Sequence, residues 1–157
     1  VLFRSNIVPI SISYEWEPCD LLKARELHLR AIGPYNKAKD EDMKSVLTGI
    51  MQPKGHVHLS VNAPLTDEEI DRCTATDSPF DNLAALIDRR ITTGYRLHPT
   101  NYLAYDLVHH TTHFANHYSP TLKELFQQRI AAIPDAEKNI LLDVYSNPVS
   151  QQYPTLI

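Results

Sequence analysis

The sequence predicts an α/β fold, in which the last strands of a mixed sheet are followed by a helical C-terminal subdomain. Residues 7–14 form an apolar, β-branched run that is typical of a strand. Apolar and polar residues alternate at residues 56–61, which predicts a second, half-buried strand with one polar face. Four or five helical patterns follow. Because two strands alone make a marginal sheet in water, we expect further strands upstream and interpret the chain as the C-terminal part of a larger protein.

The segment between the two strands predicts two helices. Asp20 is the expected N-cap of a helix through Arg30, and Gly33-Pro34 ends it. A short helix is expected from Asp42 to Met51, because its apolar residues recur at helical spacing.

The remaining helices are predicted from their start signals. Thr66 and Glu69 form a capping-box pattern before a helix at residues 67–73. Ser78-Pro79 and Ser119-Pro120 each combine an N-cap with Pro at the first helical position. A further helix is expected at residues 101–110, and a last one from Pro134 to about Tyr145. Asn147-Pro148 is expected to end it and to leave a loose tail.

The ends of the predicted regions follow from these signals. Val1-Leu2-Phe3-Arg4-Ser5 is the translation of a common sequencing-adapter end, GTG CTC TTC CGA TCT, and we interpret residues 1–5 as adapter read-through. Residues 6–63 are then the C-terminal part of an α/β domain, residues 64–148 a helical subdomain and residues 149–157 a tail.

Composition narrows the class of protein. The 157 residues are 43% hydrophobic and 22% charged, as in an ordinary globular chain. The formal charge of −4 gives no broad basic signature for nucleic acid. No apolar run approaches the length that crosses a bilayer. Cys19 and Cys73 lie far apart and outside any metal or redox motif, which favours a reduced intracellular protein and leaves a disulfide open.

Several strings along the chain resemble one family. They are Ile7-Val8-Pro9-Ile10 and, in order, SISYEWEPCD (11–20), LKARE (22–26), LTGIMQPKGHVHL (47–59), LIDRRI (86–91), GYRLHPTNYLAYDL (94–107) and VYSNPVSQQ (144–152). Together they resemble the C-terminal half of the bacterial 1-acyl-glycerol-3-phosphate acyltransferase-like proteins, within the glycerolipid acyltransferase family. The resemblance covers nearly all of residues 6–152.

The resemblance implies an enzyme of phospholipid biosynthesis that transfers a fatty acyl group from acyl-CoA or acyl carrier protein to a lysophosphatidate-like acceptor. Such a protein is expected to lie peripherally at the cytoplasmic face of the inner membrane and to need no cofactor. The family's chemistry uses a His as general base and an Asp five positions later to orient it. None of the eight histidines of this chain has an Asp five residues on, and the family's Pro-Glu-Gly block is absent. No catalytic residue is therefore assigned. Pro9 is the one substrate-binding residue that transfers, in a block thought to shape the acyl or acceptor pocket.

Two histidine groups offer other chemistry. His109, His113 and His117 would align on a helix continued to Tyr118, with His110 beside them, and two histidines one turn apart can bind zinc. A closed site needs further ligands, so a polar helix end is favoured and no metal ligand is assigned. His56 and His58, with Lys54 before them, could contact an anionic phosphate or CoA group. The favoured interpretation is that they form the solvent face of an alternating strand.

Two further groups have the same double interpretation. The basic side chains could bind anionic lipid, but interspersed acids favour an ordinary charged surface; they are Lys23, Arg25, Arg89, Arg90 and Arg96. The tyrosines could contact acyl chains, but their helical spacing favours a core; they are Tyr95, Tyr102 and Tyr105, with Leu103 and Leu107. The alternative to an acyltransferase is a non-enzymatic helical module that binds a membrane or a partner, or else a His-rich metal binder.

Overall fold

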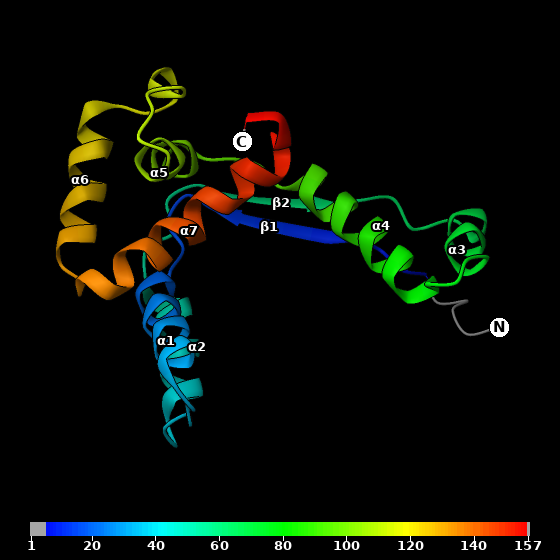
Figure 1. Cartoon of the computed structure of the whole chain (residues 1–157), viewed down its shortest axis with the longest axis horizontal. Coiled ribbons are helices and arrows are strands. Elements are labelled where there is room, and N and C mark those ends of the chain that lie inside the picture. Colours follow the sequence, from blue (N-terminus) through cyan, green and yellow to red (C-terminus); the bar gives the residue numbers. More distant parts are fainter. Residues whose placement is uncertain (1–5, 157) are drawn as a thin grey trace. The chain divides into compact units, whose positions relative to one another are not determined.

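The computed structural model describes residues 6–156; residues 1–5, interpreted above as adapter read-through, and residue 157 lie outside the described part. The described chain is α/β, mostly helical, with a small antiparallel sheet of two strands (Figure 1). Its elements, in order, are β1 (Ile10–Tyr14), α1 (Asp20–Ile32), α2 (Glu41–Met51), β2 (Val57–Val61), α3 (Asp67–Thr74), α4 (Pro79–Gly94), α5 (Pro99–Val108), η1 (Ala115–His117), α6 (Pro120–Ala131), α7 (Asp135–Gln152) and η2 (Pro154–Leu156).

The chain divides into two compact units. The first holds residues 6–13 and 58–96 of the described chain, and the second holds residues 14–57 and 97–156. Each unit therefore combines segments that are distant in sequence. The boundaries expected at residues 63 and 148 stay predictions, as does the mixed sheet, because the described strands form only the antiparallel pair β1–β2.

The two strands turn their serines inward and their branched apolar residues outward. The Asn62 N–H donates to the Pro9 carbonyl at 3.0 Å, which sets Ile10 opposite Val61 and Ile12 opposite Leu59. Ile10 and Ile12 are 50% and 48% exposed, whereas Ser11 is only 4% exposed. In β2, Leu59 and Val61 are 58% and 62% exposed, so the expectation that the apolar residues of this strand are its buried side is wrong for the described chain. A Cβ on Gly94 would lie 2.9 Å from Ser11 Oγ, so this glycine lets α4 approach the serine face closely.

The first unit has a small core of its own, built by α3 and α4. Leu65, Ile70 and Leu83 are buried together. The predicted capping box is confirmed, because Thr66 Oγ1 accepts the Glu69 N–H at 3.2 Å and the Glu69 carboxylate accepts the Thr66 N–H at 3.0 Å. Glu69 also pairs with Arg90 of α4 at 2.5 Å, which ties the two helices together.

The second unit has the larger core, where α7 packs against both α5 and α1. Its fully or nearly fully buried apolar side chains come from α1, α5, α6 and α7; they are Ala24, Leu103, Ala104, Phe126, Leu141 and Tyr145. Tyr105 and Val149 are buried with Phe114 in an adjoining cluster. The interpretation of Tyr105 and Leu103 as core residues is confirmed.

Several helix boundaries differ from the prediction, three of them with a clear physical reason or consequence. The α7 helix continues through Pro148 to Gln152, because burial of Val149 against Tyr105 and Phe114 offsets the hydrogen bond that proline cannot donate. The α5 helix ends at Val108 rather than at the predicted His110, and His110 adopts a positive φ of 53°, so the continuation that would align the histidines is absent from the described chain. Asp20 is the first residue of α1 rather than its N-cap, which is Cys19.

Candidate functional site

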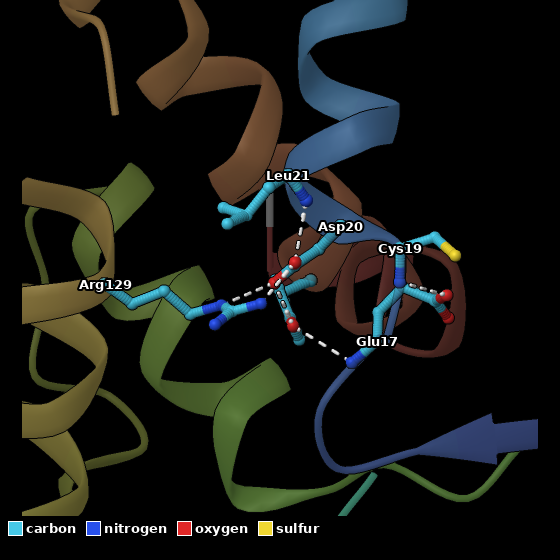
Figure 2. Close-up of polar contacts among 6 residues, drawn as sticks. Glu17, Cys19, Asp20, Leu21 and Arg129 are labelled. Atoms are coloured by element: carbon cyan, nitrogen blue, oxygen red, sulfur yellow. Dashed lines mark hydrogen bonds and ion pairs between the residues drawn. The ribbon is translucent and has the colours of Figure 1, made fainter. Parts of the chain in front are cut away.

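The polar centre of the second unit is a network around Asp20, at the start of α1 (Figure 2). Arg129 of α6 donates to the Asp20 carboxylate through Nε at 2.8 Å and Nη2 at 2.5 Å. The Tyr145 hydroxyl of α7 donates to the same carboxylate at 2.7 Å and accepts the Glu17 N–H at 3.0 Å. The side chain of Asp20 is 1% exposed, so the bidentate pair and the Tyr145 hydroxyl together join three helices inside the protein.

The network perturbs the groups around it. Burial, together with the nearby Asp20 carboxylate, raises the pKa of the Tyr145 hydroxyl, so that it remains a hydrogen-bond donor at any physiological pH. Burial likewise raises the pKa of the Glu17 carboxyl. The hydrogen bond to Asp20 raises the pKa of the Arg129 guanidinium, whose carbon also lies 5.9 Å from the centre of the Trp16 ring. The two opposite charges of Asp20 and Arg129 are paired with each other, which is typical of a structural contact.

A second carboxylate, Glu15, pairs with His56 where the two strands end. Glu15 Oε2 lies 2.7 Å from His56 Nδ1 and accepts the His56 N–H at 3.0 Å. Burial opposes ionisation of Glu15, but the hydrogen bonds and positive charge of His56 and the charge of His98 lower its pKa overall. Gly55 makes this approach possible, because its φ is +61° and a Cβ there would lie 2.5 Å from Glu15 Oε2.

The Glu15–His56 pair has a form that could move a proton. A carboxylate that orients one ring nitrogen leaves the other free to accept a proton. The His56 side chain is 87% exposed, however, and the Glu15 side chain only 16%. Glu15 also lines an open surface cavity of about 610 Å³ with His117, Ser119 and Thr121. This cavity offers hydroxyl, imidazole and carboxylate groups to a polar ligand, and His56 is not among its lining residues.

A further cavity, of about 520 Å³, opens between α1 and α2. Its apolar lining includes Leu22 and Leu29. Three cationic and three acidic side chains surround it, so it does not select an anion by net charge; they are Arg25, Lys39 and Lys44, and Glu26, Asp40 and Glu41.

The residue predicted to bind substrate, Pro9, is buried just before β1. Its carbonyl accepts the backbone N–H of Asn62 and, at 3.3 Å, the Asn62 side-chain amide. Pro9 is therefore buried on the same side as Ser11 and Ser13, and its carbonyl contributes to pairing the two strands. Its assignment to an acyl or acceptor pocket stays a prediction.

The anion-binding group expected around His56 separates in the structure. Lys54 Nζ donates to the carbonyls of Ile50 and Gln52, at 3.3 and 3.1 Å, and so caps the end of α2. His56 is engaged by Glu15, while His58 is half-buried on the serine face of β2. The expectation that both histidines face solvent is thus confirmed for His56 and wrong for His58.

Two of the four histidines after α5, His109 and His117, pack on tyrosine rings, and the four are not aligned on a helix. The rings of His109 and Tyr105 are 4.2 Å apart, and those of His117 and Tyr102 are 4.3 Å apart. Asp106 organises the loop by accepting hydrogen bonds from the Phe114 N–H, Thr111 and Tyr118. Burial, together with the hydrogen bond to Asp106, raises the pKa of Tyr118 to about 12. Within residues 6–156, no three His, Cys, Asp or Glu side chains are grouped so as to hold a metal ion.

Members of the remaining predicted groups (the basic side chains, the tyrosines and the cysteines) have structural contacts or stay unlinked. Arg90 pairs with Glu69. Tyr102 lies against Phe114, with ring centres 4.9 Å apart. Cys19 and Cys73 are free thiols.

Sequence reasoning missed Glu15, Arg129 and Tyr145 as site residues. Glu15 could have been found, because it directly follows the first strand and His56 directly precedes the second. Antiparallel pairing of the two strands brings these positions together. Arg129 and Tyr145 lie 109 and 125 residues from Asp20, and no local pattern signals their contact.

The chain matches no family model, no curated protein and no solved structure. None of the helices in the described part is long and apolar enough to cross a membrane.

Proposed function

We propose that this chain is the C-terminal portion of a glycerolipid-type acyltransferase. Further strands, together with the catalytic His and Asp, would lie upstream in the parent protein. The parent would transfer an acyl group from acyl-CoA or acyl carrier protein to a lysophosphatidate-like acceptor in phospholipid biosynthesis. This reaction comes from the resemblance of residues 6–152 to that family. No residue of this chain is given a catalytic role.

The outward apolar face of the two strands is the observation that supports a larger parent most strongly. Its residues come from both strands and the segment before β1, and their exposed fractions run from 38% to 62%; they are Val8, Ile10, Ile12, Leu59 and Val61. A contiguous branched apolar face on a sheet is normally covered by another layer. Both strands also keep one edge without a partner strand in residues 6–156. A mixed sheet completed by upstream strands, and covered on this face, would satisfy both needs.

The roles within the parent follow from this placement. Pro9 would keep its place in the block that shapes the acyl or acceptor pocket, where its burial and its two bonds from Asn62 hold the chain in one position. The Asp20–Arg129–Tyr145 network would hold the helices of the second unit together. The parent would act at the cytoplasmic face of the membrane without a metal or redox cofactor.

An acyl-transfer assay tests the proposal. The purified 157 residues are expected to release no CoA thiol from acyl-CoA with lysophosphatidate above the buffer rate. The complete parent reading frame is expected to do so, and substitution of its upstream His by Ala is expected to abolish the activity. Transfer by the 157 residues alone, or inactivity of a folded parent with both donors and both glycerol 3-phosphate and its 1-acyl form, would contradict the proposal.

A second candidate, a non-enzymatic module that docks on a membrane or partner, is favoured by one feature. The α2 helix has no buried residue and carries a row of exposed apolar side chains. The two candidates differ in what precedes Asn6: the module needs no catalytic motif there, whereas the acyltransferase does.

A further inference from the structure

One face of α2 is apolar and uncovered in the described chain. The residues of this apolar stripe recur at positions i, i+3, i+4, i+7 and i+8, and their exposed fractions are 63%, 57%, 49%, 70% and 77%; they are Met43, Val46, Leu47, Ile50 and Met51. An amphipathic helix normally buries such a stripe against a core. Here the helix is held in place by its other side.

The half-covered side of α2 is made of small and polar residues. Glu41, Ser45, Thr48 and Gly49 are the half-covered positions of the helix. Cys19 Sγ donates to the Ser45 carbonyl at 3.4 Å, and a Cβ on Gly49 would lie 3.6 Å from the same sulfur. These contacts hold this side of α2 against Cys19, just before α1, while the apolar stripe is exposed. Figure 1 shows the two helices extending away from α5 and α6 of the same unit.

The hairpin formed by α1 and α2 is basic within an acidic protein. Residues 20–54 carry seven Lys and Arg against five Asp and Glu, although the whole chain carries 15 against 19. Six of these cations are exposed; they are Lys23, Arg25, Arg30, Lys37, Lys39 and Lys44.

The acids of the hairpin are largely engaged within the protein. Asp20 is buried against Arg129, Glu26 pairs with Arg30, and Asp42 pairs with Lys37. Glu41 accepts hydrogen bonds from Tyr35 and from the Ala38 N–H. Burial of Asp20 leaves seven cations in residues 20–54 against four acids, of which Asp40 and Asp42 are exposed, so the outward charge of the hairpin is net positive.

We propose that the α1–α2 hairpin docks on an anionic lipid surface, with α2 lying in the plane of the interface. Its apolar stripe would enter the boundary between head groups and acyl chains, while the lysines contact lipid phosphates. Two copies that met through this hairpin would bring like positive charges together, whereas an anionic lipid surface complements them. This inference rests on the proposed function, in which the acyl acceptor is a membrane lipid. It adds to that function the residues that would contact the membrane.

Vesicle co-sedimentation of the 157-residue chain tests this docking. We expect binding to vesicles of equal parts phosphatidylcholine and phosphatidylglycerol, and much weaker binding to phosphatidylcholine alone. The double variant Leu47→Asp/Ile50→Asp should bind about tenfold more weakly or worse, because two inserted apolar groups are lost. Lys37→Glu/Lys39→Glu should reduce only the phosphatidylglycerol-dependent part. Phe80→Asp is the matched control, since Phe80 is 65% exposed in the other unit and should not alter binding.

Circular dichroism establishes that each variant keeps its helices before binding is compared. Equal binding by the chain and the Leu47→Asp/Ile50→Asp variant, or no binding of the folded chain to either vesicle, would overturn the inference. A lipid-free dimer that this variant converts to a monomer would assign the stripe to a second copy instead. None of these results depends on acyl transfer, so the docking inference can fail while the acyltransferase proposal stands, and the reverse.

Discussion

The hydroxyl of Tyr145 lies 2.7 Å from Oδ2 of Asp20, although the two residues are 125 positions apart in sequence. Together with Arg129 they join the start of α1 to α6 and α7. A buried carboxylate with a bidentate guanidinium and a phenol hydroxyl has all its main acceptor positions used. One anionic side chain therefore links three helices of the second unit.

Replacing Asp20 by Asn should destabilise the second unit strongly. The Arg129 guanidinium would lose its charged partner while remaining two-thirds covered, which costs about 3 kcal/mol. Urea unfolding followed by the fluorescence of Trp16, the single tryptophan, reports on this region, because the Trp16 and Phe126 ring centres are 5.8 Å apart. Asp135→Asn is the control: that side chain is 95% exposed in its pair with Lys138, and we expect no measurable change. Equal stability of both variants would show that the network does not hold the helices.

The Glu15–His56 pair should make stability depend on pH on the acid side. The pKa of Glu15 is lowered below its usual value of 4.5 in the folded chain, so the unfolded chain binds a proton more readily. The stabilisation is present above the unfolded pKa and is lost as the pH falls through the folded pKa. In Glu15→Gln this acid-side loss should shrink, measured as the unfolding free energy along a pH series. An unchanged slope would mean that the pair contributes nothing to folding.

Gly55→Ala should be destabilising by about 1–2 kcal/mol. Its φ of +61° is unfavourable for a side chain, and the new Cβ would lie 2.5 Å from Glu15 Oε2. Gly33→Ala provides the comparison, since nothing lies within 4 Å of a Cβ there. Thermal unfolding of the two variants should therefore separate them, with Gly55→Ala lower in Tm. If Gly33→Ala is the less stable of the two, the close approach of Glu15 is not what the glycine serves.

Polar substitutions on the outward face of the two strands should lower the unfolding free energy less in this chain than in its proposed parent. Ile12→Thr/Leu59→Thr changes two residues that are 48% and 58% exposed, so the unfolding free energy of the 157 residues should move by no more than about 0.5 kcal/mol. In the parent the same side chains would be covered, and the loss should exceed about 2 kcal/mol. Chemical denaturation of both proteins makes the comparison. Identical small effects in both would mean that no further layer covers this face.

Local signals in the sequence predicted the elements well. The capping box at Thr66 and Glu69 and the N-cap Ser119 are found as expected, because each signal acts over three or four residues. The end of α7 was missed because burial of Val149 overrides the local effect of Pro148. The orientation of the strands was missed because alternation gives two faces but does not say which one is covered.

The candidate site was less accessible to sequence reasoning. Glu15 and His56 could be brought together by pairing the two strands, but the Asp20–Arg129–Tyr145 network depends on long-range packing. His109, His113 and His117 have helical spacing in the sequence, whereas the helix ends at Val108 and the rings of His109 and His117 pack on Tyr105 and Tyr102. Spacing alone could not foresee this, because where a helix ends is decided by the packing of the loop that follows, here around Asp106.

The most direct test of the proposed parent enzyme is the sequence of the gene upstream of Asn6. The proposal predicts an open reading frame that continues upstream, diverges from Val1–Ser5, and carries a His and an Asp five positions apart followed by a Pro-Glu-Gly block. A start codon or an in-frame stop codon just before Asn6, or a long upstream frame without that pair, would contradict it.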